Sequence, residues 1–328
     1  MHMDNFLFSD WHTRLAPHLS SKILSGICLF LLLAAISGCR PAQAQFQAST
    51  STAPVIQTSQ PTRQAPSTPT KTPTPVATAS PTILPTPTSS PTPPVCLRKP
   101  GKVEQQSLRS SLLKLPMEVR VYLPPCYAEV QAQHYPVLYL IHGMNNTEQQ
   151  WTDLGVDETA DRLIQSGEVQ PFIIVMPHDR LWKEPSQTNF DEVFIDELIP
   201  WADQNYRTRP ERAYRAIGGL SRGGMWAIHF GFGNWQLFGE IGAHSAPVFF
   251  EDARQLSGWL DDIPQSQLPR IYLDIGDKDY LSRSNQWFEN LLNTKNIPHE
   301  YHQFPGYHED AYWKAHVEAY LRWYAAGW

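Results

Sequence analysis

The chain has 328 residues, of which 41% are hydrophobic and 12% aromatic, so it has enough apolar side chains for one large core or two smaller ones. Its formal net charge is −6, with 26 Lys and Arg against 32 Asp and Glu. This balance excludes the basic surface that nucleic-acid-binding proteins use, so nucleic acid is not an expected partner. The 29 prolines are enriched early in the sequence, which indicates that the N-terminal part is organised differently from the rest.

The N-terminal segment, residues 1–38, contains an apolar run at residues 23–36. The run is shorter than the roughly 20 residues that cross a bilayer, and its length is typical of the hydrophobic region of a secretory signal. The following Ile-Ser-Gly-Cys resembles the lipobox of bacterial lipoproteins, which implies that Cys39 becomes a lipid-modified first residue and a membrane anchor. The alternative is an ordinary signal peptide cleaved after Ala44. Both interpretations predict export.

Residues 39–95 are rich in Pro, Thr and Ser and contain almost no charged or large apolar side chains. Such a segment cannot bury enough apolar surface to offset the entropy lost on ordering, so the composition predicts a disordered, extended linker. At about 3.1 Å per residue, it could hold the following domain up to about 180 Å from an anchor.

The globular domain is expected at residues 96–328 and begins with two alternating strands, at residues 103–108 and 117–123. Cys96 and Cys126 lie on either side of this pair. In an exported protein the two cysteines can form a disulfide, and two free thiols are the alternative.

The remainder of the domain alternates between apolar strands and amphipathic helices. Strands are expected at residues 135–141, 171–177, 213–217, 238–243, 270–275 and 299–304, and helices at residues 156–165, 191–205, 284–293 and 310–324, with a further helix starting near residue 225. This alternation predicts an α/β fold with a mostly parallel central sheet and helices on both faces.

The sequence Gly-Gly-Leu-Ser-Arg-Gly-Gly at residues 218–224 lies between an expected strand and an expected helix. A Gly-x-Ser-x-Gly sequence in this context is the nucleophile elbow, in which glycines allow strand and helix to approach each other closely. The motif also occurs by chance in glycine-rich turns. In the elbow interpretation, Ser221 is a nucleophile whose hydroxyl points out of the turn.

A serine nucleophile requires a base and an orienting acid, which are expected on loops after later strands. His308 is the candidate base, because it lies in a turn between the last strand and the last helix. The candidate acid is Asp279, with Asp277 as the alternative. Both follow the expected strand at residues 270–275. The other histidines of this region, among them His229, His302 and His316, are interpreted as packing or surface residues.

The transition state of acyl transfer needs donors for a developing oxyanion. The backbone N–H of Arg222 is one candidate, because it begins the helix after the elbow. The backbone N–H of Met144 is the other, on the loop after the strand at residues 135–141. His142 is interpreted as a structural residue that holds this loop. The aromatic candidates for an acyl or sugar pocket, most of which are expected in the core, are Trp182, Trp226, Phe249, Phe250 and Trp259.

Six short segments in this order resemble the "Putative esterase" family, which includes feruloyl and acetylxylan esterases, esterase D and mycolyltransferases. They are Tyr-Leu-Pro at 122–124, Leu-Ile-His-Gly at 140–143, Asp-Glu-Leu-Ile-Pro at 196–200, Gly-Leu-Ser-Arg-Gly-Gly at 219–224, Gly-Asp-Lys-Asp at 276–279, and His308 with Trp-Lys at 313–314. The resemblance covers about residues 98–328. It implies an α/β-hydrolase fold, a triad of Ser221, His308 and Asp279, and acyl-ester chemistry without a metal or other cofactor.

The leading hypothesis is therefore a serine carboxylic ester hydrolase, tethered to a membrane, that acts on a small-molecule or polysaccharide-linked ester. Acyl transfer to a sugar or lipid acceptor, as in mycolyltransferases, is one alternative. A catalytically inactive domain displayed on a stalk as a binding module is another. No pattern in the sequence chooses between feruloyl, acetyl and siderophore esters.

Overall fold

The computed structural model describes residues 95–328. The predicted signal peptide, the predicted lipidation site at Cys39 and almost all of the predicted linker lie outside the described residues. Among residues 95–328, no helix combines the length and the apolar character that a membrane crossing requires.

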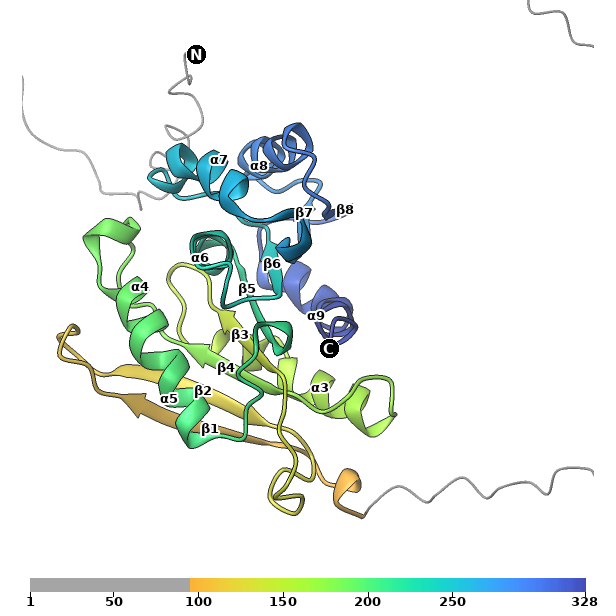
Figure 1. Cartoon of the computed structure of the whole chain (residues 1–328). Helices are drawn as coiled ribbons and strands as arrows, with labels where there is room; N and C mark the ends of the chain where they lie inside the picture. The colour runs from red at the N-terminus through yellow and green to blue at the C-terminus, as the bar shows by residue number, and fades with distance from the viewer. Residues whose placement is uncertain (1–94) are drawn as a thin grey trace, which may run out of the picture. The chain divides into compact units, whose positions relative to one another are not determined.

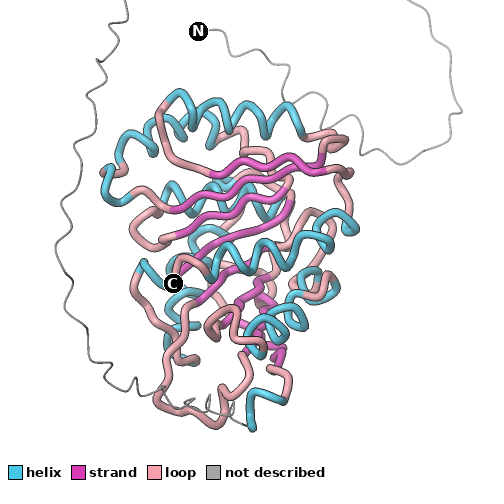
Figure 2. The backbone as a smooth tube through the Cα atoms, turned by 90° about the vertical axis from the view of Figure 1, so that its right-hand side faces the viewer, coloured by secondary structure: helices cyan, strands magenta, loops and turns pink. Residues whose placement is uncertain are grey.

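The described residues contain one eight-stranded sheet in the order β1-β2-β4-β3-β5-β6-β7-β8 (Figures 1 and 2). The strands are β1 (Lys102–Leu108), β2 (Met117–Leu123), β3 (Val137–Ile141), β4 (Ile173–Pro177), β5 (Arg215–Leu220), β6 (Glu240–His244), β7 (Arg270–Gly276) and β8 (Glu300–Phe304). β1 and β2 pair antiparallel, β2 runs antiparallel to β4, and the strands from β4 to β8 are parallel to their neighbours. The predicted mostly parallel sheet is confirmed.

Helices cover both faces of the sheet (Figure 1). The helices are α2 (Gln150–Asp153), α3 (Val156–Gln165), α4 (Phe190–Val193), α5 (Ile199–Asn205), α6 (Arg222–Gly233), α7 (Asp252–Asp262), α8 (Ser282–Thr294) and α9 (Asp310–Ala325). One core cluster joins α4 to α8 to one face, and a second joins α3 and α9 to the other. The central strands β3 to β6 are buried along their whole length, which explains why β3 and β4 read as continuous apolar runs.

The short helix α2 was not expected, and two longer elements also differ from the expected pattern. The helix expected at residues 191–205 is interrupted by a π-helical turn, η3 (Phe194–Leu198). Pro200 lies in the first turn of the helix that follows, and because proline has no N–H, it cannot continue an undisturbed hydrogen-bond ladder. Helix α7 was not expected, since it carries a glycine at its centre and buries only two apolar residues, Leu256 and Leu260.

A disulfide joins Cys96 to Cys126, whose Cα atoms lie 5.0 Å apart. Cys96 belongs to a short 3₁₀ turn, η1 (Val95–Arg98), and Cys126 follows β2. The bond therefore attaches the first described residues to the end of an inner strand of the sheet, at the point where the predicted linker enters the domain.

We expect replacement of Cys96 and Cys126 together by serine to lower the free energy of unfolding by about 3 to 4 kcal/mol, because the bond closes a loop of 30 residues in the unfolded chain. Urea denaturation of the oxidised protein and of the double variant measures the difference. Added reductant serves as the control: it should destabilise the native protein and leave the double variant unchanged. Equal unfolding midpoints for the two oxidised proteins would contradict the expectation.

Candidate active site

Ser221 lies in the turn between β5 and α6, in a strained backbone conformation with φ 52° and ψ −119°. A Cβ atom on Gly219 would overlap the backbone of Gly223, and one on Gly223 would overlap the carbonyl of Ile141. The two glycines therefore allow β5, α6 and β3 to pack in backbone contact, and this packing holds Ser221 at positive φ. The expected strand-turn-helix elbow is present, with the strand running on to Leu220.

His308 and Asp279 lie beside Ser221. The Nε2 atom of His308 is 2.9 Å from the Oγ atom of Ser221, and its Nδ1 atom is 2.8 Å from the Oδ2 atom of Asp279. Asp279 is only 3% exposed, and its other oxygen accepts the backbone N–H of Leu281. The structure thus brings together three residues that are separated by up to 87 positions in the sequence. In this arrangement, His308 can take the proton of the Ser221 hydroxyl, and Asp279 can stabilise the imidazolium that results.

Asp277 has a different partner. Its carboxylate accepts the backbone N–H of Gly306, and the N–H of Lys278 donates to the carbonyl of Gly306. These bonds join the turn after β7 to the loop that carries His308. Of the two candidate aspartates, Asp279 contacts the imidazole, whereas Asp277 holds the backbone near it.

The two expected oxyanion donors are the backbone N–H groups of Met144 and Arg222. Within residues 95–328, neither group donates a hydrogen bond to a protein acceptor. Arg222 is the first residue of α6, where N–H groups have no partner within the helix. The loop that carries Met144 passes next to the nucleophile, since a Cβ on Gly143 would lie 3.5 Å from the Cβ of Ser221. Both donors therefore belong to segments in contact with the serine.

His142 fixes the first of these segments. Its Nε2 atom accepts the backbone N–H of Asp179 at 2.9 Å, so the ring proton resides on Nδ1, which donates to the carbonyl of Gly143 at 2.7 Å. In a trans peptide the next N–H, that of Met144, points away from the carbonyl that His142 holds. Burial lowers the pKa of His142 to about 4, so the imidazole is neutral at physiological pH.

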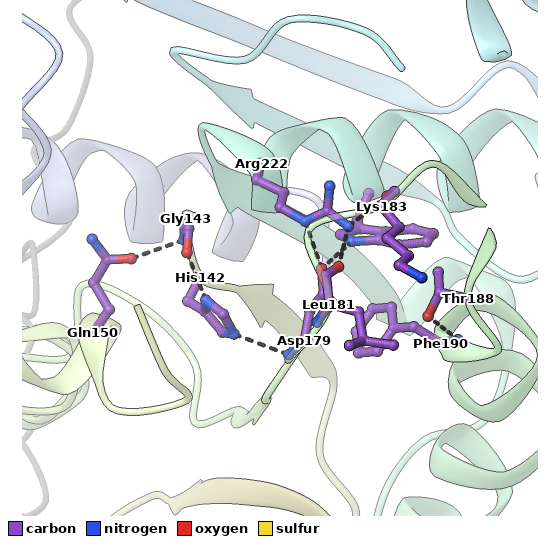
Figure 3. A network of polar contacts seen from close by, with 10 residues as sticks. His142, Gly143, Gln150, Asp179, Leu181, Lys183, Thr188, Phe190 and Arg222 are labelled. Atoms are coloured by element: carbon purple, nitrogen blue, oxygen red, sulfur yellow. Dashed lines mark hydrogen bonds and ion pairs between the residues drawn. The ribbon is translucent and has the colours of Figure 1, made fainter. Parts of the chain in front are cut away.

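Two further side chains reinforce this end of the sheet (Figure 3). The amide oxygen of Gln150 accepts the N–H of Gly143, and its amide nitrogen donates to Asp310 at the start of α9. The Arg222 side chain is buried and forms an ion pair with Asp179 at 2.7 Å. Neither interaction was expected from the sequence. The one available signal was the position of Asp179, a charged residue directly after a buried strand.

The aromatic candidates separate into two groups. Trp226 and Phe249 are fully buried in the core, and Trp259 packs against it from the surface. Trp182 and Phe250 are 55% and 41% exposed. Two exposed residues that were not among the candidates, Tyr280 and Tyr307, lie next in sequence to Asp279 and His308.

Within the described part of the chain, no group of three or more His, Cys, Asp or Glu side chains is arranged to hold a metal ion. The titratable residues of the site instead pair with one another and with backbone groups.

Residues 110–324 match the family model described as "Putative esterase". The chain belongs to this family. An endo-1,4-beta-xylanase/feruloyl esterase of Xylanibacter ruminicola is 32% identical over 164 residues, which are 46% of this chain and 22% of the relative. An esterase of Mycobacterium tuberculosis is 33% identical over 138 residues, which are 40% of this chain and 29% of the relative. The chain thus spans less than a third of these curated relatives.

The fold is also found among solved structures of esterases. A ferulic acid esterase superimposes with a TM-score of 0.63 and 25% identity, over 70% of this chain and 98% of that one. The predicted α/β-hydrolase fold is confirmed, and so is the resemblance to the esterase family.

Because the buried His142 is neutral, we expect the free energy of unfolding to depend on pH. Because burial lowers the pKa from 6.5 to about 4, the unfolded chain takes up a proton more readily than the folded one. The stability that His142 contributes is therefore complete above about pH 6.5 and decreases as the pH falls toward 4, by about 3 kcal/mol. Urea denaturation across this range should show a steeper loss for the native protein than for His142→Asn.

The exposed His134 provides the control. A His134→Asn variant makes the same replacement at an exposed position and should keep the native free energy of unfolding at pH 7, because few contacts are lost there. Parallel pH profiles for the native protein and His142→Asn would contradict the prediction.

Proposed function

We propose that this chain is a serine carboxylic ester hydrolase with Ser221 as nucleophile, His308 as general base and acid, and Asp279 as the orienting acid. The observation that carries the proposal is the continuous chain of contacts from the Ser221 Oγ atom through both nitrogens of His308 to Asp279, at 2.9 and 2.8 Å. Membership of the esterase family supports the same reaction.

In the proposed mechanism, the Oγ atom of Ser221 attacks the ester carbonyl while its proton moves to the Nε2 atom of His308. The tetrahedral intermediate collapses and expels the alcohol, which takes the proton from His308. Water then attacks the acyl-enzyme while its proton moves to His308. The second tetrahedral intermediate collapses, the bond between the acyl carbon and the Oγ atom of Ser221 breaks, and His308 returns the proton to Oγ as the carboxylic acid leaves. Throughout, the carboxylate of Asp279 holds the imidazole in one tautomer and stabilises its charged form.

The backbone N–H groups of Met144 and Arg222 are proposed to bind the oxyanion of both tetrahedral intermediates. Support comes from their unpaired state and from their location on the two segments that contact Ser221. Donors held by folded backbone require no reorganisation when the charge develops, so each one stabilises the transition state more than the substrate.

The proposed substrate is an ester of an aromatic or short acyl group, free or linked to a polysaccharide. Tyr280 is 52% exposed, and its ring centroid is 4.8 Å from that of the His308 imidazole. An exposed ring in this position offers a flat apolar surface to an acyl group or a sugar. Tyr307, which precedes His308 in the sequence, is also 52% exposed. Relatives named as feruloyl esterases support the same substrate class.

We further propose that the enzyme is exported and tethered to a membrane through a lipid on Cys39, with residues 39–95 as the linker. The apolar run at residues 23–36 and the lipobox-like sequence support export with lipidation. The disulfide between Cys96 and Cys126 supports an oxidising compartment.

We expect Ser221→Ala to lower kcat for a short-chain nitrophenyl ester by about 10⁶-fold, because the variant has no nucleophile. Steady-state kinetics of the native protein and the variant, on this ester and on methyl ferulate, measure the loss. An unimpaired Ser221→Ala variant would contradict the proposed mechanism.

Asp279 and Asp277 form a matched pair of controls, because they lie two residues apart on the same turn. We expect Asp279→Asn to lower kcat by roughly 10³- to 10⁴-fold, since the imidazole loses its orienting carboxylate. Asp277→Asn weakens only the contact to Gly306, so its kcat should stay within about tenfold of the native value. Equal losses in the two variants would exclude Asp279 as the acid of the triad.

The tether is tested in the full-length chain expressed in a bacterial host. We expect the native protein to incorporate an alkyne-labelled fatty acid and to sediment with membranes, whereas Cys39→Ala does neither. A native protein that is released unlabelled, with Gln45 as its first residue, would show the alternative cleavage instead.

A further inference from the structure

Asp179 lies at the centre of a buried polar network directly after β4 (Figure 3). Its side chain is 2% exposed, and its two carboxylate oxygens together accept three hydrogen bonds from the protein. One oxygen accepts the Nε group of Arg222 at 2.7 Å and the indole N–H of Trp226 at 2.8 Å. The other accepts the backbone N–H of Leu181 at 3.1 Å. The backbone N–H of Asp179 is used as well, because it donates to the Nε2 atom of His142.

Two of these bonds, those with Arg222 and His142, lead to the two proposed oxyanion donors. Through its carboxylate, Asp179 holds the side chain of Arg222, the residue whose own backbone N–H is the first donor. Through its backbone, it holds the ring of His142, which in turn holds the carbonyl of the peptide that carries the second donor, the N–H of Met144. In Figure 3, His142 and Arg222 contact Asp179 from different sides.

We propose that Asp179 is a positioning residue that fixes the two oxyanion donors relative to each other. This inference rests on the proposed ester hydrolysis, and it concerns how that site is organised. Met144 follows β3 and Arg222 begins α6, and Asp179, after β4, is the residue bonded to both segments.

The chemistry of the network suits this role. The guanidinium of Arg222 also donates to the carbonyls of Leu181 and Lys183, so a buried cation is surrounded by acceptors. Because the carboxylate of Asp179 balances its charge, the pair places no net negative charge near a developing oxyanion. A charge-assisted hydrogen bond to a planar guanidinium fixes both the orientation of the Arg222 side chain and its distance from Asp179. Displacement of a catalytic group by about 1 Å can cost a factor of about 100 in rate.

The chain contains a matched pair for comparison. At the opposite end of β5, the buried Arg215 forms an ion pair with Asp203 at 2.9 Å. Asp203 also accepts the hydroxyl of Thr208, so it too has more than one partner. Loss of its charge should therefore disturb the same strand without reaching the oxyanion donors.

The test compares Asp179→Asn with Asp203→Asn in the full chain. For a short-chain nitrophenyl ester, we expect Asp179→Asn to lower kcat by about 100-fold and to change KM by less than about threefold. A trifluoromethyl ketone, which forms an oxyanion on the serine, should bind more weakly by the same factor as the loss in kcat/KM. Asp203→Asn should lower the melting temperature while kcat and ketone affinity stay within about threefold of native.

Three results would each overturn this inference without affecting the proposed function. The first is a native-like kcat in Asp179→Asn, and the second is a loss of kcat in that variant without a loss of ketone affinity. The third is an equal loss of kcat in Asp179→Asn and Asp203→Asn. If Asp179→Asn does not fold, Arg222→Lys decides by the same criteria, because lysine keeps the charge and loses the planar contact. Absence of hydrolysis by the native chain itself would overturn the proposed function, and this inference with it.

Discussion

The backbone contact between β5, α6 and β3 is the constraint on which the site depends. Side chains are absent at Gly219 and Gly223, so the strand, the helix and the neighbouring strand meet without intervening atoms. The chain must reverse within one residue, and Ser221 takes up the strain at φ 52°. The same packing places the first turn of α6 and the loop after β3 on either side of the serine. The positions of the nucleophile and of the unpaired N–H groups around it thus follow from the close packing of β5, α6 and β3.

The catalytic loops are bonded to one another as well as to the sheet. The turn after β7 pairs with the loop after β8 through Asp277 and Gly306. Gln150 connects the loop after β3 to the start of α9, two residues beyond His308. Because these bonds cross between segments, the distances within the proposed triad are set by folded backbone rather than by flexible side chains alone. Such an arrangement is pre-organised for its reaction.

Buried polar groups also lie beneath the site. Asp274 on β7 is fully buried, and it accepts the hydroxyls of Tyr312 and Tyr320 from α9 and contacts His244 at 2.6 Å. The carbonyl of His244 accepts the N–H of Ser221. This network links the helix that follows the histidine to the strand beside the serine. Together with the pair of Asp179 and Arg222, it gives the site polar supports on both faces of the sheet, each with its hydrogen bonds satisfied.

The sequence by itself determined the family, the mostly parallel sheet and the three residues of the proposed triad. Apolar runs in the sequence indicated the buried strands, because a strand covered on both faces needs apolar side chains on both. The glycine pattern indicated the elbow, because glycine permits the close approach of strand and helix. Local patterns gave a weaker signal for α7, which buries little, and for the π turn in front of Pro200. Only the tertiary structure brought Asp179 to Arg222, and it added the contact between His308 and Asp279, the acid that the sequence already favoured over Asp277. Those contacts join segments far apart in the chain, and no spacing in the sequence encodes which side chains meet across the edge of a sheet.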